Sequence, residues 1–228
     1  MKKVLCSFFM ALLAVVMFAQ KDVTTFLGIP VDGTKSEMMK NLISKGFEVV
    51  PEQEFLKGEF NGTDVQVYIG TNNNKVYRIM LCDADYRSEA NIKDRFNKLI
   101  EQFKKNKRYS FFDDSNHTLS DDVDISYEMN IQNKEFDALF FQKPDVELID
   151  TVAIDEALRE KMLVKYTKEQ LENPTKEIEK ELGLLRVEYL LEYIKKKPVW
   201  FTISSFEDEY YITMYYDNEY NRANGEDL

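Results

Sequence analysis

Residues 55–82 read FLKGEFNGTDVQVYIGTNNNKVYRIMLC, a pattern of three strands separated by two turns. Asn61-Gly62 is a hairpin signal, because both residue types adopt the positive φ angles that a tight two-residue turn requires. Asn72-Asn73-Asn74 marks the second turn. In the middle strand apolar side chains alternate with polar ones and share one face: Val65, Val67 and Ile69. The stretch therefore predicts an antiparallel β-meander with one apolar face.

An amphipathic helix is predicted on each side of this meander. Thr34-Lys35-Ser36-Glu37 has the pattern of a capping box, and Gly46 can end a helix in a left-handed turn, which predicts a helix over residues 35–45. After the meander, apolar residues recur at helical spacing from Ser88 to Asn106: Ile92, Phe96, Leu99, Ile100 and Phe103. We expect this second helix to cover the apolar face, so residues 35–106 read α-β-β-β-α.

The segment that follows predicts a second hairpin. Residues 111–124 are polar and rich in acids, as in a loop. Beyond them, residues 125–131 alternate between apolar and polar, Asn133-Lys134 can form a turn, and residues 136–141 can return as the partner strand. Pro144 ends this unit.

Residues 151–197 have the periodicity of helices. One helix is marked by Ile154, Leu158 and Met162, and Thr167 can cap a short one. Asn173-Pro174 predicts a long helix with proline at its first position, where a missing N–H does no harm. This long helix carries two apolar stripes, which predicts apolar contacts on two of its sides: Ile178, Leu182, Leu185 and Tyr189 on one, and Leu184, Val187, Leu191 and Ile194 on the other.

Residues 199–205 and 209–216 form the clearest hairpin in the chain, and a polar, turn-like tail follows from Asp217 to Leu228. Strand alternation places about half of the hairpin's rings on each face, which is more than one buried face needs. Aromatic side chains dominate recognition hot spots, so five rings are the candidate binding residues: Trp200, Tyr210, Tyr211, Tyr215 and Tyr216. The alternative is that these rings belong to the core, and solvent accessibility distinguishes the two.

The amino-terminal residues have the form of a secretory signal peptide. Lys2 and Lys3 precede an apolar run over residues 4–18 that is too short to span a bilayer, and Ala19 offers a small residue for cleavage. We expect a mature protein that starts at Gln20, works in the periplasm or outside the cell, and has no membrane insertion after cleavage.

Charge and cysteine content argue against several functions. The chain has 30 basic and 41 acidic side chains, a net charge of -11, and loss of the two lysines of the signal peptide takes it from -11 to -13. Nucleic acids and anionic membranes are therefore not expected partners, because they bind clusters of Lys and Arg. Once Cys6 leaves with the signal peptide, Cys82 has no cysteine to pair with, so stability rests on packing and hydrogen bonds.

Both ends of the chain resemble a known group of proteins. FLGIPVDG at residues 26–33 resembles the start, and YYDNEYNRANGEDL at residues 215–228 the end, of uncharacterised exported α+β proteins of Bacteroides-like bacteria. The likeness does not extend to residues 151–197, which look like an insertion. It implies export and an α+β architecture, and it implies no catalytic residue. A looser likeness of fold, to β-lactamase-inhibitory protein and to outer-membrane assembly lipoproteins of the SmpA/OmlA type, implies no function.

These patterns together predict an α+β fold, with an antiparallel β-meander and hairpins covered by helices. We expect one domain over residues 20–228, with an added helical segment at about residues 151–197.

No motif in the sequence identifies a reaction or a cofactor. His117 is the one histidine, and no G-x-S-x-G turn offers a serine to pair with it. Cys82 is expected to be a small core residue on a buried strand, which disfavours a reactive thiolate. The acids around His117 are calcium candidates, although their spacing is not that of an EF-hand: Asp113, Asp114, Asp121 and Asp122. With one His and one mature Cys, a zinc site is not expected.

The sequence therefore predicts an exported, non-enzymatic binding or scaffold protein, whose partner is a protein or a glycan. One alternative is a hydrolase that acts on glycan or peptide through two facing carboxylates about 5–9 Å apart. Another is an inhibitor of a second enzyme. Asp150-Thr151-Val152 matches the short O-glycosylation signal used on exported proteins of the bacteria that the resemblance points to, so Thr151 is a candidate for modification.

Overall fold

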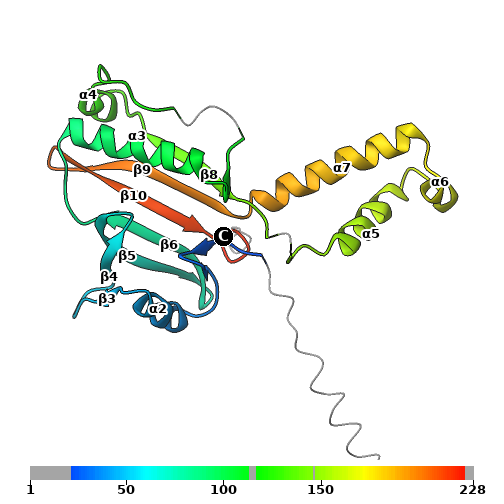
Figure 1. The fold of residues 1–228 in the computed structure, drawn as a ribbon, viewed down its shortest axis with the longest axis horizontal. Coiled ribbons are helices and arrows are strands. Elements are labelled where there is room, and N and C mark those ends of the chain that lie inside the picture. The colour runs from blue at the N-terminus through cyan, green and yellow to red at the C-terminus, as the bar shows by residue number, and fades with distance from the viewer. Residues whose placement is uncertain (1–21, 113–116, 146, 224–228) are drawn as a thin grey trace, which may run out of the picture.

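The computed structural model describes residues 22–112, 117–145 and 147–223 (Figure 1). The predicted signal peptide and two of the calcium candidates, Asp113 and Asp114, lie outside the described residues. The main feature is an eight-stranded antiparallel sheet with the order β3-β4-β5-β6-β10-β9-β8-β7. Helices and this sheet confirm the α+β fold class.

The meander and its two helices are confirmed. The three predicted strands are β4 (Leu56–Phe60), β5 (Thr63–Asn72) and β6 (Lys75–Asp83). A short strand that was not predicted, β3 (Glu48–Val49), pairs with β4. Helix α2 (Lys35–Ser44) begins with the predicted capping box: the Thr34 hydroxyl accepts the Glu37 N–H at 3.3 Å, and the Glu37 carboxylate accepts the Thr34 N–H at 2.9 Å. Gly46 follows the helix with φ 99°. Helix α3 (Glu89–Lys105) covers the apolar face.

The closing hairpin consists of β9 (Pro198–Phe206) and β10 (Glu209–Asp217). Strand β10 lies in the middle of the sheet, where it pairs with both β9 and β6. Its inward side chains meet α3 and the inward side chains of the meander in one continuous core. A short hairpin of β1 (Thr25–Phe26) and β2 (Ile29–Pro30) packs against the same core through Phe26, which is fully buried.

The predicted hairpin of residues 125–131 and 136–141 is wrong. Residues Ile125–Asn130 form helix α4, because the Asp124 carboxylate accepts the N–H of Tyr127 at 2.8 Å and caps a helix. Ile125 and Met129 share one side of this helix and pack on the core, whereas Ile131 is 62% exposed. Alternation over seven residues contains the i, i+4 spacing of a helix, so the pattern was ambiguous. Strand β8 (Asp137–Gln142) pairs instead with β9 and with β7 (Tyr109–Ser110).

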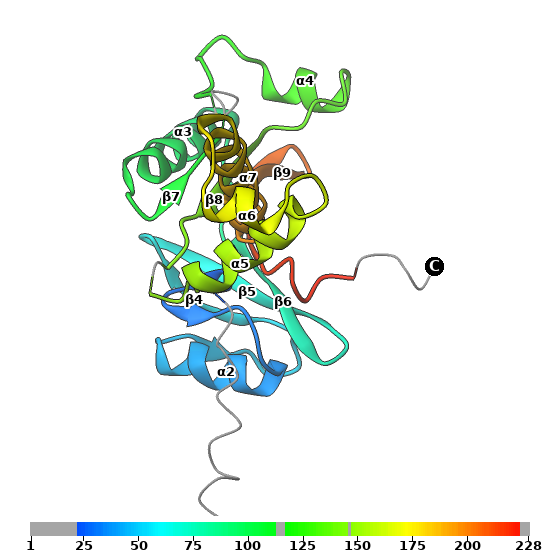
Figure 2. The same ribbon diagram turned by 90° about the vertical axis from the view of Figure 1, so that its right-hand side faces the viewer.

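Helices α5 (Thr151–Met162), α6 (Lys168–Glu172) and α7 (Lys176–Ile194) form an arm that projects from the sheet (Figure 1) and points toward the viewer in Figure 2. The arm connects β8 to β9, which are paired neighbours, so it stands where a hairpin turn would otherwise lie. It has a small core of its own, made by Met162, Leu171 and Ile178. Its base is joined to the segment before β1 by an ion pair of 2.5 Å between the buried Lys197 and Asp22.

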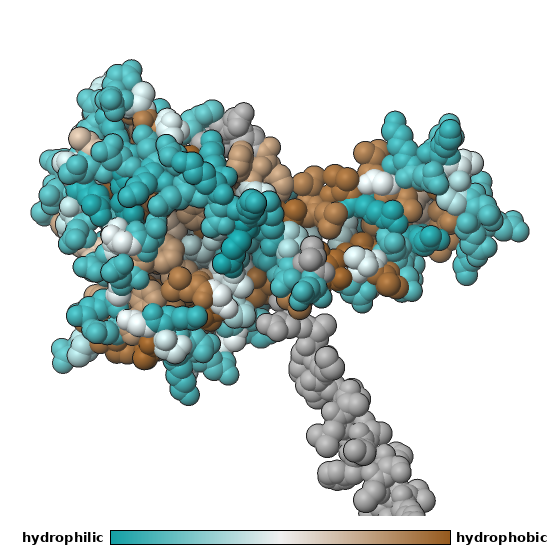
Figure 3. All heavy atoms as spheres, viewed as in Figure 1, coloured by the Kyte–Doolittle hydropathy of each residue, from teal (hydrophilic) through white to brown (hydrophobic). Residues whose placement is uncertain are grey.

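Two expectations for the long helix are corrected. Pro174 precedes α7, and Thr175 is the capping residue. The first apolar stripe packs toward the core of the arm through Ile178, Leu182 and Leu185. The second stripe is largely exposed, with Leu184 at 62% and Val187 at 55% exposure, and apolar surface shows on the arm in Figure 3. No helix among the described residues is both long and apolar enough to cross a membrane.

The first residues of the predicted polar tail are buried, which corrects the expectation of a surface turn. Asn218 is 0% exposed: its side-chain amide donates to the carbonyl of Val31 at 2.7 Å and its side-chain oxygen accepts from the N–H of Tyr220 at 3.0 Å. The Asn221 amide donates to both the Asp32 carboxylate and the Val76 carbonyl, each at 2.8 Å. These bonds join the end of the described chain to its beginning.

Replacing Asn218 tests this junction. Asn218→Ala leaves two buried backbone groups without partners, so we expect it to lower the free energy of unfolding by about 1–3 kcal/mol. Urea denaturation followed by circular dichroism measures the change. Asn130→Ala, on the exposed end of α4, is the matched control and should change stability by less than about 0.5 kcal/mol. Equal effects of the two substitutions would contradict the structural role of Asn218.

Candidate functional site

The helices α2, α3 and α4 pack on one face of the sheet, and the side chains that point away from them form a second face. We call this surface the open face. Strand register places its members on the same side of five neighbouring strands: Gln66, Tyr68, Arg78, Met80, Cys82, Leu139, Trp200, Thr202, Ser204, Tyr211, Thr213 and Tyr215. Most of these residues are only partly buried. No described helix packs over them in the manner of α3.

The five predicted binding rings are divided between the two faces. Tyr210 and Tyr216 are each 4% exposed and belong to the core. Trp200, Tyr211 and Tyr215 are partly buried on the open face. Alternation along β9 and β10 causes this division, because neighbouring residues such as Tyr215 and Tyr216 point to opposite sides of a strand.

Trp200 and Tyr215 form the centre of the open face. They are directly opposite on β9 and β10, and their rings stack with centroids 3.9 Å apart at 15°. The Arg78 guanidinium lies 4.7 Å from the Tyr215 ring centre and 5.7 Å from that of Trp200. A partly buried planar cation beside two stacked rings can make contacts with π systems and polar partners.

Asp217 holds this group in place. Its buried carboxylate accepts two bonds from Arg78, at 2.6 and 2.7 Å, and one from the indole N–H of Trp200 at 3.2 Å. Hydrogen bonding to Asp217 raises the pKa of Arg78 above its already high ordinary value. Because a bidentate pair fixes the orientation of the guanidinium, little side-chain freedom is left to lose on binding. The group is therefore pre-organised.

A second ring group extends the open face toward the β9–β10 turn. Tyr86 contacts Tyr211 at a centroid distance of 5.6 Å and Phe206 at 5.8 Å. Tyr86 is 50% and Phe206 54% exposed. These large exposed rings add apolar surface to the turn end of the open face.

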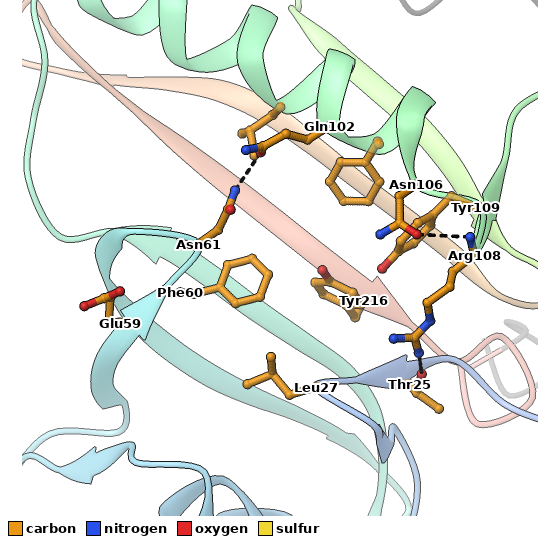
Figure 4. A pocket seen from close by; sticks show the side chains of 12 residues that line it. Thr25, Leu27, Glu59, Phe60, Asn61, Gln102, Asn106, Arg108, Tyr109 and Tyr216 are labelled. Atoms are coloured by element: carbon orange, nitrogen blue, oxygen red, sulfur yellow. Dashed lines mark hydrogen bonds between the residues drawn. The ribbon is translucent and has the colours of Figure 1, made fainter.

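A cavity of about 500 Å³ lies on the opposite, helix-bearing side of the sheet (Figure 4). Tyr216 reaches it from β10, and Arg108 and Tyr109 reach it from the segment after α3. It carries one carboxylate, Glu59, among the residues that line it.

The hydrolase alternative stays a prediction, but two carboxylates that line further cavities already have partners. In a second cavity, beside β2, Asp22 is already paired with Lys197. In a third, hydrogen bonds from the Thr34 backbone and hydroxyl lower the pKa of Glu37, the opposite of what a general acid requires. These carboxylates serve the fold.

The remaining candidates lie apart from one another. His117, Asp121 and Asp122 are exposed, and a hydrogen bond from Ser120 lowers the pKa of Asp122. In the described residues, no group of three or more His, Cys, Asp and Glu side chains is placed to hold a metal ion. Thr151 is exposed at the start of α5, beside the capping residue Asp150, so the proposed O-glycosylation stays a prediction.

Cys82 differs from its expected place in the core. It is partly buried on the open face, with its sulfur 3.9 Å from the Thr213 hydroxyl. Burial raises the pKa of the thiol, so the thiolate that a nucleophile needs is disfavoured at neutral pH.

No protein-family model matches the chain, and comparison with curated proteins and with solved structures finds no match. The candidate site therefore rests on geometry. Sequence reasoning identified the rings but not Arg78 or Asp217. The sequence signal for Arg78 was strand alternation. The outward-pointing residues of β6 lie beside the outward-pointing residues of β10, such as Tyr215.

The thiol provides a test of the open face. At pH 8 we expect iodoacetamide to label Cys82 more slowly in the native protein than in urea, because burial raises the thiol pKa above that of the unfolded chain, about 8.5. The same difference lowers the free energy of unfolding as pH rises past the unfolded pKa, since the unfolded state loses its proton first. Mass spectrometry of the Cys82 peptide measures the rates. Equal rates would show that the thiol is not shielded.

Proposed function

We propose that this protein is an exported, non-enzymatic binding protein that recognises a protein or glycan of the bacterial envelope through its open face. The observation that carries the proposal is the stacked Trp200–Tyr215 pair, with Arg78 held beside it by Asp217. The pair lies on a sheet face that the described helices leave uncovered.

The chemistry of this surface supports recognition rather than catalysis. Trp, Tyr and Arg are the residues most enriched in binding hot spots, and such residues cluster near the centre of an interface. Ring faces also stack on sugar rings, so a glycan chain lying across the strands would meet the same groups. The open face extends over five neighbouring strands, and a surface of that breadth suits a protein partner.

The proposed export rests on the amino-terminal sequence. Residues 2–19 have the charge and length of a signal peptide. The chain is acidic, so it does not attract nucleic acid. Its clustered rings on the sheet suit it to binding other partners outside the cytoplasm. The inhibitor role is a special case of the same proposal, in which the partner is an enzyme.

Affinity capture from the envelope fraction of the native host tests the proposal. The bait is the protein itself, beside a Trp200→Ala, Tyr211→Ala double variant that circular dichroism shows to be folded. We expect capture of a specific partner that binds the double variant at least about tenfold more weakly than it binds the parent. A tenfold loss of affinity is about 1.4 kcal/mol, a loss that removal of hot-spot side chains can cause.

Tyr127→Ala is the matched control, because this tyrosine is 49% exposed on α4, away from the open face. It should capture the partner as the parent does. Treating the fraction with protease or with glycosidase identifies the partner as protein or glycan. Equal capture by parent and double variant would remove the open face as the binding surface.

A further inference from the structure

The cavity beside α3 is assembled from segments far apart in the sequence (Figure 4). The end of α3 contributes one wall, the turns after β1 and β4 contribute another, and β10 contributes the floor. Its volume, about 500 Å³, falls within the range of small-molecule sites, roughly 300–1,000 Å³.

The floor is apolar and ring-lined. Tyr216 is 4% and Phe103 8% exposed, and the Phe60 ring lies edge-on to Tyr216 with centroids 6.4 Å apart. Burial and the neighbouring Tyr109 raise the pKa of Tyr216, so its phenol is neutral at physiological pH. Such a floor suits the face of a small ring.

Amide groups form the rim on one side. The Asn61 amide donates to the Gln102 side-chain oxygen at 2.7 Å, which joins the β4–β5 turn to α3 across the mouth of the cavity. This bond leaves the Asn61 oxygen and the Gln102 nitrogen available to a ligand. Glu59 lies on the same strand end, but its carboxylate points away from these amides (Figure 4). The two amides can bind several hydroxyl groups.

Arg108 stands at the other end of the cavity, away from Glu59 (Figure 4). Its guanidinium makes one long contact, 3.4 Å, to the Thr25 hydroxyl. Of the six other arginines of the described chain, Arg159 contacts the Leu171 carbonyl at 3.3 Å, and five lie within 4 Å of a carboxylate: Arg78, Arg87, Arg95, Arg186 and Arg222. In so acidic a chain, Arg108 is thus a cation at a cavity without an acidic partner among the described residues. Guanidinium binds carboxylates in a bidentate manner.

Leu27 provides an independent indication that the cavity binds a ligand. It occupies a two-residue turn with Gly28, at φ 51°, a conformation that a bulky residue adopts at a conformational cost. The other two-residue turns with positive φ carry polar residues or glycine: Asn61-Gly62, Asn73-Asn74 and Glu207-Asp208. Leu27 is 41% exposed and lies beside Phe60 and Tyr216 in the cavity. Leucine is thus an unfavourable residue for this turn, but its side chain adds apolar surface to the cavity.

We propose that this cavity binds an acidic sugar residue, a uronic acid. The sugar ring lies against Leu27, Phe60 and Tyr216, its carboxylate pairs with Arg108, and its hydroxyl groups bond to the amides of Asn61 and Gln102. The site is separate from the open face and does not depend on it.

Isothermal titration of the full chain with galacturonic acid and with trigalacturonate tests this site, with galactose as the neutral match. We expect saturable binding of at least one acid, and at least tenfold weaker binding of galactose. Arg108→Gln should abolish the preference for the acid. Lys107→Gln, an exposed neighbour outside the lining, should leave it unchanged.

Leu27→Asn separates binding from folding. Asparagine suits the turn better than leucine, so the variant should melt at the same temperature as the parent or higher, yet bind the acid at least about fivefold more weakly. If the protein binds trigalacturonate but not galacturonic acid, the ligand is a glycan chain. If it binds both acids equally, a single sugar residue is sufficient for binding. No saturable binding of either acid, or binding unchanged by both Arg108→Gln and Leu27→Asn, overturns the proposal. The Trp200→Ala, Tyr211→Ala variant should bind as the parent does, which keeps this result independent of the open face.

Discussion

The structure depends on the one-sided burial of a wide antiparallel sheet. The apolar residues of β5, β6, β9 and β10 point to the same side, where α2 and α3 cover them. An antiparallel sheet can leave its other side in contact with solvent. In this chain the solvent side carries rings and an arginine, and the helix side carries a cavity between its covering elements. Both proposed sites follow from that arrangement.

Local patterns in the sequence were sufficient for the meander, for α2 and α3, and for the closing hairpin. In these segments the turn residues, the capping residues and the spacing of the apolar residues all predict the same elements. Agreement of this kind between local signals is what specifies a fold. The prediction of a strand over residues 125–131 was wrong because a short alternating run also fits a helix. The Asp124 cap favours the helix. The pairing of β8 with β9 across the whole arm could not be derived, since no local signal links strands so far apart.

The candidate site was predictable only in part. Aromatic content pointed to the closing hairpin, but which rings face outward depends on the side that α3 covers. Arg78 and Asp217 come together through the pairing of β6 with β10, and the cavity needs the turn at Leu27 beside the end of α3. These are contacts between distant segments. A single sequence offers no covariation from which to infer them.

The central position of β10 also orders events in time. Until β10 is present, β6 and β9 each have an unpaired edge, and Tyr216 and Met214 are missing from the core. A chain in which the closing hairpin has not yet docked therefore exposes a strand edge, and an edge of that kind can pair with another chain.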